Sequence, residues 1–249
     1  MLKVARQAYS TNGIVYVIEG GLKIFLRFWW LRLQIFPEQY FRFTRHGRAF
    51  TFNGEQLPYL IKRYNRTWRR ERTVEVPIVL SLITREGQGR VLEVGDVLSH
   101  YVEFPHDLVD KYERNVAAIK SDIVNFSPVS KYDLVVSIST FEHIGYDEHI
   151  YYDKNEPRNP SKILEVIENL KRNCLNPGGK IIFTLPVGYN RELDRYITEG
   201  VLQVTELFYM KRVSRDNQWV QVSEKEASDS TYGKRFPFAN AVVIGVIKT

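Results

Sequence analysis

The chain lacks the features that mark disulfide-stabilised, secreted or membrane-spanning proteins. Its 249 residues contain one cysteine, Cys174, which excludes an internal disulfide framework and favours a reducing compartment. The most apolar stretch, Leu22–Phe36, is interrupted by three basic residues and is too short and too charged to span a bilayer. Met1–Gly21 has no continuous apolar run beside a small-residue cleavage site, so no secretory signal is indicated. We expect a cytoplasmic protein.

Acidic residues are scarce near the N-terminus. Residues 1–72 hold fourteen Lys and Arg against four Asp and Glu. Subtracting this +10 from the +6 of the whole chain leaves −4 for residues 73–249. The basic segment is also rich in aromatic residues, a mixture that can stack nucleobases, contact an anionic membrane surface or hold an anionic substrate. It can equally pack onto a core while its basic side chains extend into solvent.

We therefore predict two parts, a basic aromatic N-terminal extension over residues 1–72 that packs on a core domain over residues 73–249. The charge cluster Arg69–Arg72 marks the predicted boundary. The sequence shows neither internal repeats nor low-complexity tracts. The extension gives the only support for a nucleic-acid or peripheral membrane partner.

The hydrophobic pattern predicts alternating strands and helices. The predicted strands are Ile14–Glu19, Phe50–Phe52, Val91–Val94, a stretch within Asp107–Glu113, Ala117–Asp122, Tyr132–Ser139, Lys180–Leu185 and Ala241–Lys248. The predicted helices are Leu22–Phe36, whose spacing is ambiguous, Thr73 to about Thr84, and Ser161–Cys174. Asn53-Gly54 favours a tight hairpin turn, Leu175–Gly179 favours a helix stop, and Asn217–Lys234 is predicted to be a surface hairpin or loop. This alternation indicates an α/β fold with a mostly parallel sheet.

Two strand ends carry the residues that most constrain the function. The run Arg90–Asp96 is an apolar strand that ends at Gly95, with Glu93 two residues before this glycine and Asp96 directly after it. The next apolar run ends at a second acid, Asp110. Glycine permits close backbone approach to a ligand, and a carboxylate at the next strand end can accept hydrogen bonds from hydroxyl groups. The pattern predicts a nucleotide-like cofactor.

Further motifs follow in a fixed order: Asp122-Ile123, Tyr132–His143 and Leu175–Lys180. Together with Val91–Gly95 and Asp110 they resemble the ordered motifs of class I S-adenosylmethionine-dependent methyltransferases, over roughly residues 73–249. The resemblance implies a Rossmann-like, mostly parallel seven-stranded sheet with an antiparallel last strand. It also implies that S-adenosylmethionine lies across the strand ends.

The resemblance also implies residue roles. Glu93 and Gly95 would lie against the methionine moiety, and Asp110 would accept hydrogen bonds from both ribose hydroxyls. Asp122 would meet the adenine amine, with Ile123 beside the ring. The strand end at Ser137–Thr140 would lie below the sulfonium. The predicted cofactor-binding residues are Glu93, Gly95, Asp96, Asp110, Asp122, Ile123 and Ser139.

The glycine-rich loop departs from the family pattern, because Gly95 is followed by Asp96 and no further glycine before His100. Asp96, Ser99 or His100 would then replace backbone contacts with side-chain contacts. The spacers after the first two strands are also short, which predicts shortened crossover helices. A dinucleotide site needs the full G-x-G-x-x-G pattern, so an NAD-dependent oxidoreductase is disfavoured.

The segment after the fourth core strand carries the candidate chemistry for the methyl acceptor. His143 has a pKa suited to deprotonating a hydroxyl, and with Glu142 it forms the predicted catalytic pair. Asp147 or His149 could also orient the imidazole or hold a divalent ion, although His and Asp spacing alone is weak evidence for a metal and no metal site is predicted. His143 could instead simply pack beneath the cofactor. The Asn/Asp-Pro-Pro-Tyr signature of enzymes that methylate exocyclic amines is absent, which favours an oxygen acceptor.

Three functions remain open at this point. The first is O-methylation of a small molecule or glycan, with Asn53–Arg72 and Gly188–Arg191 as walls of the acceptor pocket. The second is an RNA or other nucleic-acid methyltransferase. The third is a non-catalytic methyltransferase-like binding protein.

Overall fold

The structure, a computed structural model, describes residues 35–45, 47–86, 89–112 and 117–249. It divides into two compact units, Met1–His46 and Gly47–Thr249. In the first unit α2 (Ile35–Thr44) is described, and the Arg45 guanidinium lies 4.7 Å from the centre of the Phe41 ring. The predicted strand Ile14–Glu19 and nearly all of Leu22–Phe36 lie outside the described residues. Among the helices that are described, none is long and apolar enough to cross a membrane.

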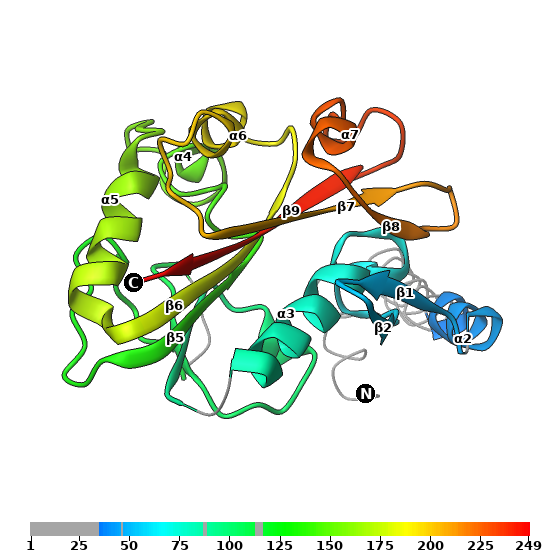
Figure 1. Cartoon of the computed structure of the whole chain (residues 1–249), viewed down its shortest axis with the longest axis horizontal. Helices are drawn as coiled ribbons and strands as arrows, with labels where there is room; N and C mark the ends of the chain where they lie inside the picture. Colours follow the sequence, from blue (N-terminus) through cyan, green and yellow to red (C-terminus); the bar gives the residue numbers. More distant parts are fainter. Residues whose placement is uncertain (1–34, 46, 87–88, 113–116) are drawn as a thin grey trace, which may run out of the picture. The chain divides into compact units, whose positions relative to one another are not determined.

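The second unit is built on a seven-stranded sheet in the order β4-β3-β5-β6-β9-β7-β8 (Figure 1). Its strands are β3 (Val91–Val94), β4 (Asp107–Val109), β5 (Tyr132–Ile138), β6 (Leu175–Pro186), β7 (Glu206–Arg212), β8 (Trp219–Val222) and β9 (Ala241–Lys248). Strands β4, β3, β5 and β6 pair in parallel. Strand β9 runs antiparallel to β6 and β7, and β8 runs antiparallel to β7. Five of the seven strands therefore run one way, which confirms the predicted Rossmann-like sheet with an antiparallel last strand.

One predicted strand is wrong. Ala117–Asp122 makes only a single parallel bridge, between Ile119 and Val109. The Ile119 amide donates to the Leu108 carbonyl. The chain then turns away from the sheet at Asp122, whose side chain accepts from the Val124 amide. The sheet instead gains two strands that the pattern did not predict, β7 and β8, at the opposite edge.

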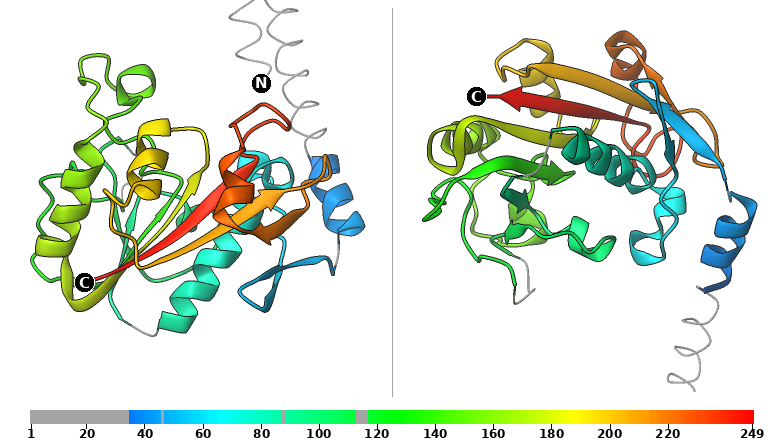
Figure 2. Two further views of the ribbon diagram at one scale, coloured as in Figure 1. Left: turned by 45° about the horizontal axis from the view of Figure 1, so that its top comes forward. Right: turned by 60° about the horizontal axis from the view of Figure 1, so that its bottom comes forward.

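The sheet has a core on each face because successive side chains of a strand point to opposite faces. In β5, for example, Val135 packs on one face while Leu134 and Val136 pack on the other. The first face is covered by α5 (Lys162–Asn169), α6 (Arg191–Thr198) and α7 (Glu224–Ser228). The second is covered by α3 (Arg72–Glu86), and Figure 2 shows α6 and α7 on the opposite side of the sheet from α3.

Residues 47–72 belong to the same unit as the sheet, whereas the sequence placed them in the extension. The predicted hairpin is confirmed: β1 (Ala49–Phe52) and β2 (Glu55–Pro58) pair around Asn53-Gly54, both of which have positive φ. Phe50, Phe52 and Leu57 are buried in the core that α3 shares. Their burial against α3 joins the hairpin to the sheet domain.

The predicted shortening of the first crossover is confirmed, because one 3-10 turn, Leu98–His100, is the only helical segment between β3 and β4. The predicted helix at Ser161–Cys174 forms as α5 and a π turn, Leu170–Cys174. The helical segment ends at Cys174, as the helix-stop pattern at Leu175–Gly179 predicted, and those residues form the beginning of β6. The predicted loop at Asn217–Lys234 contains β8 and α7, and a short helix α4 (Glu148–Tyr151) follows β5.

Candidate functional site

Gly95 makes the turn at the end of β3. Its φ is +88°, and a Cβ added there would lie 2.3 Å from the Thr140 hydroxyl. A side chain would therefore be strained and would also collide with the end of β5. The Gly95 amide donates to the Val109 carbonyl at 3.1 Å, which fixes the turn against β4. Glycine is needed here so that β3, β4 and β5 can end close together.

Glu93 lies beneath this turn and does not line the cavity. Its carboxylate is fully buried and accepts hydrogen bonds from the amides of Val97 and Leu98, at 3.0 and 2.8 Å. Its other oxygen meets His106 Nε2 at 2.8 Å. The bond to Glu93 raises the pKa of His106 against the opposing effect of burial. Glu93 thus anchors the loop that stands where a full crossover helix would begin.

Asp96 holds the outer part of the same loop. Its Oδ1 accepts from the Ser99 hydroxyl, and its Oδ2 lies 3.7 Å from His100 Nε2. The His100 ring stacks on the Tyr64 ring at 3.9 Å between centres. The three loop residues that the sequence singled out therefore contact one another, and Asp96 alone of them lines the cavity.

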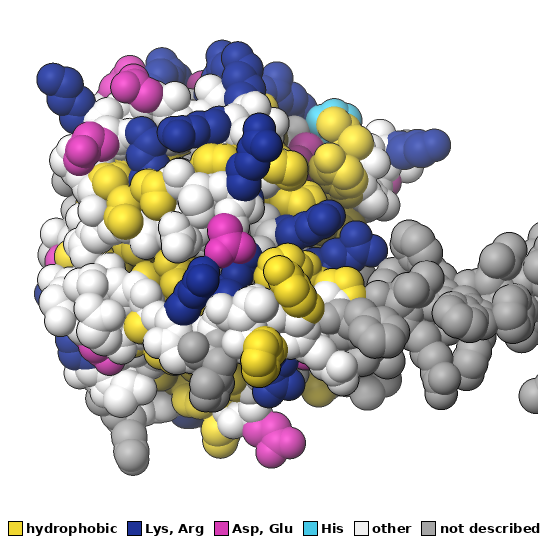
Figure 3. Space-filling view, turned by 90° about the vertical axis from the view of Figure 1, so that its right-hand side faces the viewer, with side chains coloured by type: hydrophobic (Ala, Val, Ile, Leu, Met, Phe, Trp, Pro, Cys, Tyr) yellow, Lys and Arg dark blue, Asp and Glu magenta, His cyan; other side chains and the backbone are white. Residues whose placement is uncertain are grey.

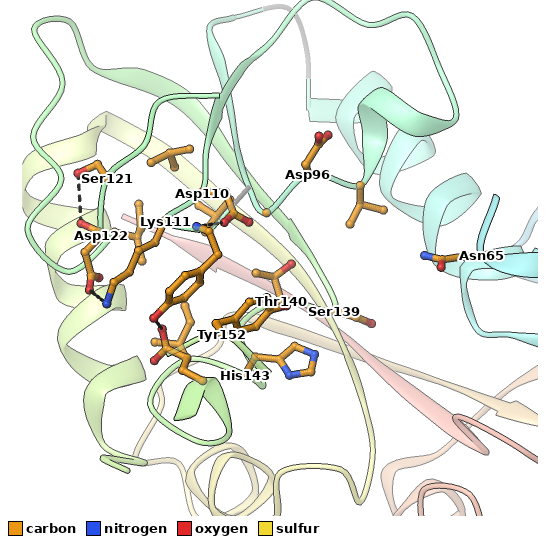
Figure 4. A pocket seen from close by; sticks show the side chains of 18 of the residues that line it. Asn65, Asp96, Asp110, Lys111, Ser121, Asp122, Ser139, Thr140, His143 and Tyr152 are labelled. Atoms are coloured by element: carbon orange, nitrogen blue, oxygen red, sulfur yellow. Dashed lines mark hydrogen bonds and ion pairs between the residues drawn. The ribbon is translucent and has the colours of Figure 1, made fainter. Parts of the chain in front are cut away.

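Asp110 and Asp122 lie where β4 and the bridging segment end. Asp110 Oδ1 accepts from the Tyr112 amide at 2.7 Å. Asp122 Oδ2 lies 3.1 Å from Lys111 Nζ and 3.2 Å from Lys162 Nζ. Burial opposes ionisation of Asp122, but the Val124 amide and the two lysines outweigh it and lower its pKa. Figure 4 shows Lys111 reaching Asp122 beside Asp110.

The first turn of α3 contacts the end of β5 through a buried ionic cluster. Glu75 is fully buried, and its Oε1 accepts from the hydroxyls of Ser139 and Thr184 at 2.6 and 2.8 Å. Its Oε2 accepts from Arg72 Nη1 at 2.5 Å. Arg72 lines the cavity, and its buried Nε has no hydrogen-bond partner among the described residues. Ser139, with φ of 40°, is held in this strained conformation by Glu75.

His143 has a fixed orientation. Its Nδ1 lies 2.9 Å from Asp147 Oδ1, and the Tyr189 hydroxyl donates to Asp147 Oδ2 at 2.6 Å. The Tyr189 ring also packs edge-on against the imidazole. Burial lowers the pKa of His143, but the bond to Asp147 and the charge of Glu142 outweigh burial and raise it.

Glu142 lies on the other side of the imidazole, away from the cavity lining. Its Oε1 is 3.9 Å from His143 Nε2, and its Oε2 is buried without a partner among the described residues. Burial raises the pKa of Glu142 to about 7. Near neutral pH this carboxyl is therefore partly protonated, beside an imidazole whose pKa is raised.

These elements enclose a cavity of about 260 Å³ at the carboxyl ends of β3, β4 and β5 (Figure 4). Ligands in open α/β sheets bind at this edge. The structure brings together seven of the nine predicted site residues on the cavity wall, namely Gly95, Asp96, Asp110, Asp122, Ile123, Ser139 and His143. Glu93 and Glu142 lie behind it. In the described part of the chain no group of His, Cys, Asp or Glu is placed to hold a metal ion.

Sequence reasoning missed several residues of the wall. Arg72 was interpreted as part of a boundary cluster, because the predicted helix began one residue later, at Thr73, whereas α3 begins at Arg72. Lys111 and Tyr112 directly follow Asp110, and their adjacency was the available signal. Tyr152 stacks on Tyr112 at 4.6 Å between ring centres, and no local pattern links these two positions. Asn65 also lines the cavity, from the segment predicted to form a substrate wall.

No family model and no curated protein matches the sequence, but solved structures do. The N-methyltransferase NodS from Bradyrhizobium japonicum WM9, in complex with S-adenosyl-L-homocysteine, is 14% identical with a TM-score of 0.46, over 72% of this chain and 87% of that chain. A SAM-dependent methyltransferase from Archaeoglobus fulgidus is 15% identical with a TM-score of 0.41, over 70% and 94%. The glycopeptide N-methyltransferase MtfA, also complexed with S-adenosyl-L-homocysteine, is 11% identical with a TM-score of 0.39, over 69% and 89%. These similarities concern the fold, so residue roles rest on the geometry of this chain.

Proposed function

We propose that the chain is an S-adenosylmethionine-dependent methyltransferase that methylates an oxygen of a small molecule or glycan. The observation that carries the proposal is the meeting of Gly95, Asp110 and His143 on one cavity wall. A glycine-lined turn, a strand-end carboxylate and an oriented base are the parts that a sulfonium cofactor and a hydroxyl acceptor require.

The cavity residues fit S-adenosylmethionine chemically. Asp110 would accept hydrogen bonds from the ribose hydroxyls, since one carboxylate can accept from two adjacent donors. Ile123 would give an apolar wall for the adenine, next to Asp122. The unpartnered Arg72 Nε would donate to the methionine carboxylate, because a guanidinium pairs well with carboxylates. Gly95 would leave room for close approach of the cofactor to the backbone.

Bound S-adenosylmethionine supplies an electrophilic methyl group on its sulfonium. The residues of the chain have to orient the acceptor and take up its proton. Asp147 accepts from the Nδ1–H of His143, which leaves Nε2 as the basic nitrogen. Tyr189 holds Asp147 from the far side. Nε2 would remove the hydroxyl proton of the acceptor, and Asp147 and Glu142 would stabilise the resulting imidazolium.

We predict that Asp110→Ala abolishes binding of S-adenosyl-L-homocysteine while the fold survives, because the ribose hydroxyls lose their acceptor. Equilibrium dialysis measures the binding, and circular dichroism checks the fold. Asp229→Ala removes an exposed carboxylate from the end of α7 and is the matched control, expected to bind as the wild type does. Unchanged affinity in Asp110→Ala would show that the site is misplaced. Screening candidate acceptors by mass spectrometry for a gain of one methyl group then identifies the substrate.

A further inference from the structure

A basic surface borders the cavity. Residues 61–72 contain six Lys and Arg and a single acid, Glu71, which is buried. Lys62, Arg66 and Arg69 are exposed and Arg63 and Arg70 are half-buried, whereas Arg72 pairs with the buried Glu75. Among the described residues no carboxylate lies within ion-pair distance of any of these five side chains, which are Lys62, Arg63, Arg66, Arg69 and Arg70.

Two buried side chains join this segment to neighbouring loops. Arg212 donates from Nη1 to the carbonyls of Arg69 and Pro237, both at 3.1 Å, and from Nη2 to the carbonyl of Arg215 at 3.2 Å. Asn217 Nδ2 donates to the carbonyls of Thr67 and Arg70, at 3.2 and 3.0 Å. The exposed side chains of Arg215 and Arg235 therefore extend the basic surface, which consists of Lys62, Arg63, Arg66, Arg69, Arg70, Arg215 and Arg235.

Few acidic residues accompany the basic surface. Asp216 is an exposed acid in the same loop as Arg215, and it pairs with Arg48 at 2.8 Å. Figure 3 views the molecule from the side of the turn between β7 and β8, and Lys and Arg side chains gather there with fewer Asp and Glu among them. A surface of this kind concentrates anions near it.

The basic surface leads into the cavity through a strained turn. Asn65 and Arg66 both have positive φ, 51° and 48°, a conformation that costs energy for residues with a side chain. Buried Thr67 maintains the turn, because its hydroxyl donates to the Leu60 carbonyl at 2.6 Å and accepts from the Lys62 amide at 2.8 Å. Asn65 lines the cavity and directly precedes Arg66 in the sequence.

We infer that the basic surface binds a polyanionic saccharide chain. It guides the sugar unit that accepts the methyl group past Asn65 into the cavity. Arginine forks match the carboxylate, sulfate or phosphate groups of such a chain. The inference rests on the proposed function, since it names the acceptor class of the same site.

The surface chemistry favours a saccharide over a nucleic acid. Single-stranded nucleic acids are bound by basic grooves that also carry aromatic platforms for the bases. Here Trp68 is only 4% exposed, and Tyr64, which is 45% exposed, has one ring face stacked on His100. Phe238 is half-buried and lies under the Arg70 guanidinium, 3.9 Å from ring centre to Cζ. The basic surface thus presents seven basic side chains against one exposed aromatic ring, that of Tyr64.

The test measures binding of fluorescent heparin octasaccharide to the full chain by anisotropy over a range of salt concentrations. We expect Arg66→Glu/Arg69→Glu to weaken heparin binding about tenfold or more. The slope of log affinity against log salt should fall in magnitude by about two, one for each lost contact. Binding of S-adenosyl-L-homocysteine should not change, because neither arginine lines the cavity.

The matched control is Lys131→Glu/Arg172→Glu. It makes the same change in net charge at two exposed positions, at the amino end of β5 and in the π turn after α5. It should leave heparin binding unchanged. An equal loss in both double variants would overturn the inference by showing a non-specific charge effect.

Two further probes separate the alternatives. A neutral dextran octasaccharide should not bind, and an RNA strand of the same charge as the heparin should bind more weakly than heparin. Tighter binding of the RNA would overturn the saccharide assignment in favour of a nucleic-acid acceptor. If the wild type binds heparin as described but does not bind S-adenosyl-L-homocysteine, the proposed function fails while the polyanion site stands.

Discussion

At the scale of single residues, two carboxylates act differently on the His143 imidazole. Asp147 contacts Nδ1 at 2.9 Å and is itself held by Tyr189. Glu142 lies 3.9 Å from Nε2, too far for a hydrogen bond, and acts through its charge. Asp147 is therefore a positioning residue that fixes the tautomer, while Glu142 contributes to the electrostatic field at the base.

We predict that Asp147→Asn lowers the pKa of His143. A carboxylate partner raises the folded-state pKa of an imidazole, so its removal allows deprotonation at lower pH. The acidic limb of the activity profile should move to lower pH. The rate constant kcat should fall by roughly tenfold to a hundredfold, because the base loses its orientation and the imidazolium loses its partner.

NMR titration of the His143 ring measures this pKa without knowledge of the acceptor. Tyr189→Phe is the matched control, since it keeps the contact between Asp147 and His143 and should shift the pKa less. A His143 pKa that is the same in Asp147→Asn and in the wild type would contradict the assignment of Asp147.

At the scale of elements, the first turn of α3 determines how the strand ends are held. Glu75 accepts from Arg72 in its own helix, from Ser139 after β5 and from Thr184 in β6. All of these groups lie in a buried region where an unpaired charge is costly. The helix therefore fixes one wall of the cavity by charge as well as by apolar packing.

We predict that Glu75→Gln lowers the free energy of unfolding by about 3 kcal/mol, because it leaves the Arg72 guanidinium without its partner in a buried site. Urea denaturation measures the change. Glu168→Gln is the control, since its exposed pair with Lys171 should contribute less than about 0.5 kcal/mol. Equal stability of Glu75→Gln and the wild type would show that the cluster does not hold the strand ends.

The sequence predicted the elements well where the pattern was local. Val91–Val94 and Ala241–Lys248 match β3 and β9, since apolar strands buried on both faces have few alternatives. The Asn53-Gly54 pair likewise predicted the hairpin of β1 and β2. The Ala117–Asp122 strand failed because the segment makes one bridge, between Ile119 and Val109, and then turns at Asp122 without continuing the ladder.

At the scale of the whole molecule, the cavity assembles residues that are distant in the sequence. The carboxyl ends of parallel strands meet at one edge, so Gly95, Asp110 and His143 could be placed together from their motifs. The roles of Arg72 and Tyr189 could not, because they depend on how α3 and the segment after β6 approach that edge. The local sequence pattern identifies the ends of the strands, whereas tertiary packing determines which other residues complete the cavity wall.

The most direct test of the account is calorimetric titration of the full chain with S-adenosyl-L-homocysteine, with melting temperature as a second readout. We predict saturable binding at a single site. At a ligand concentration of about one hundred times Kd, the stabilisation of about 2.7 kcal/mol should raise the melting temperature by roughly 5–10 °C. An absence of heat together with an unchanged melting temperature, in protein shown to be folded, would contradict the assignment of a methyltransferase cofactor site.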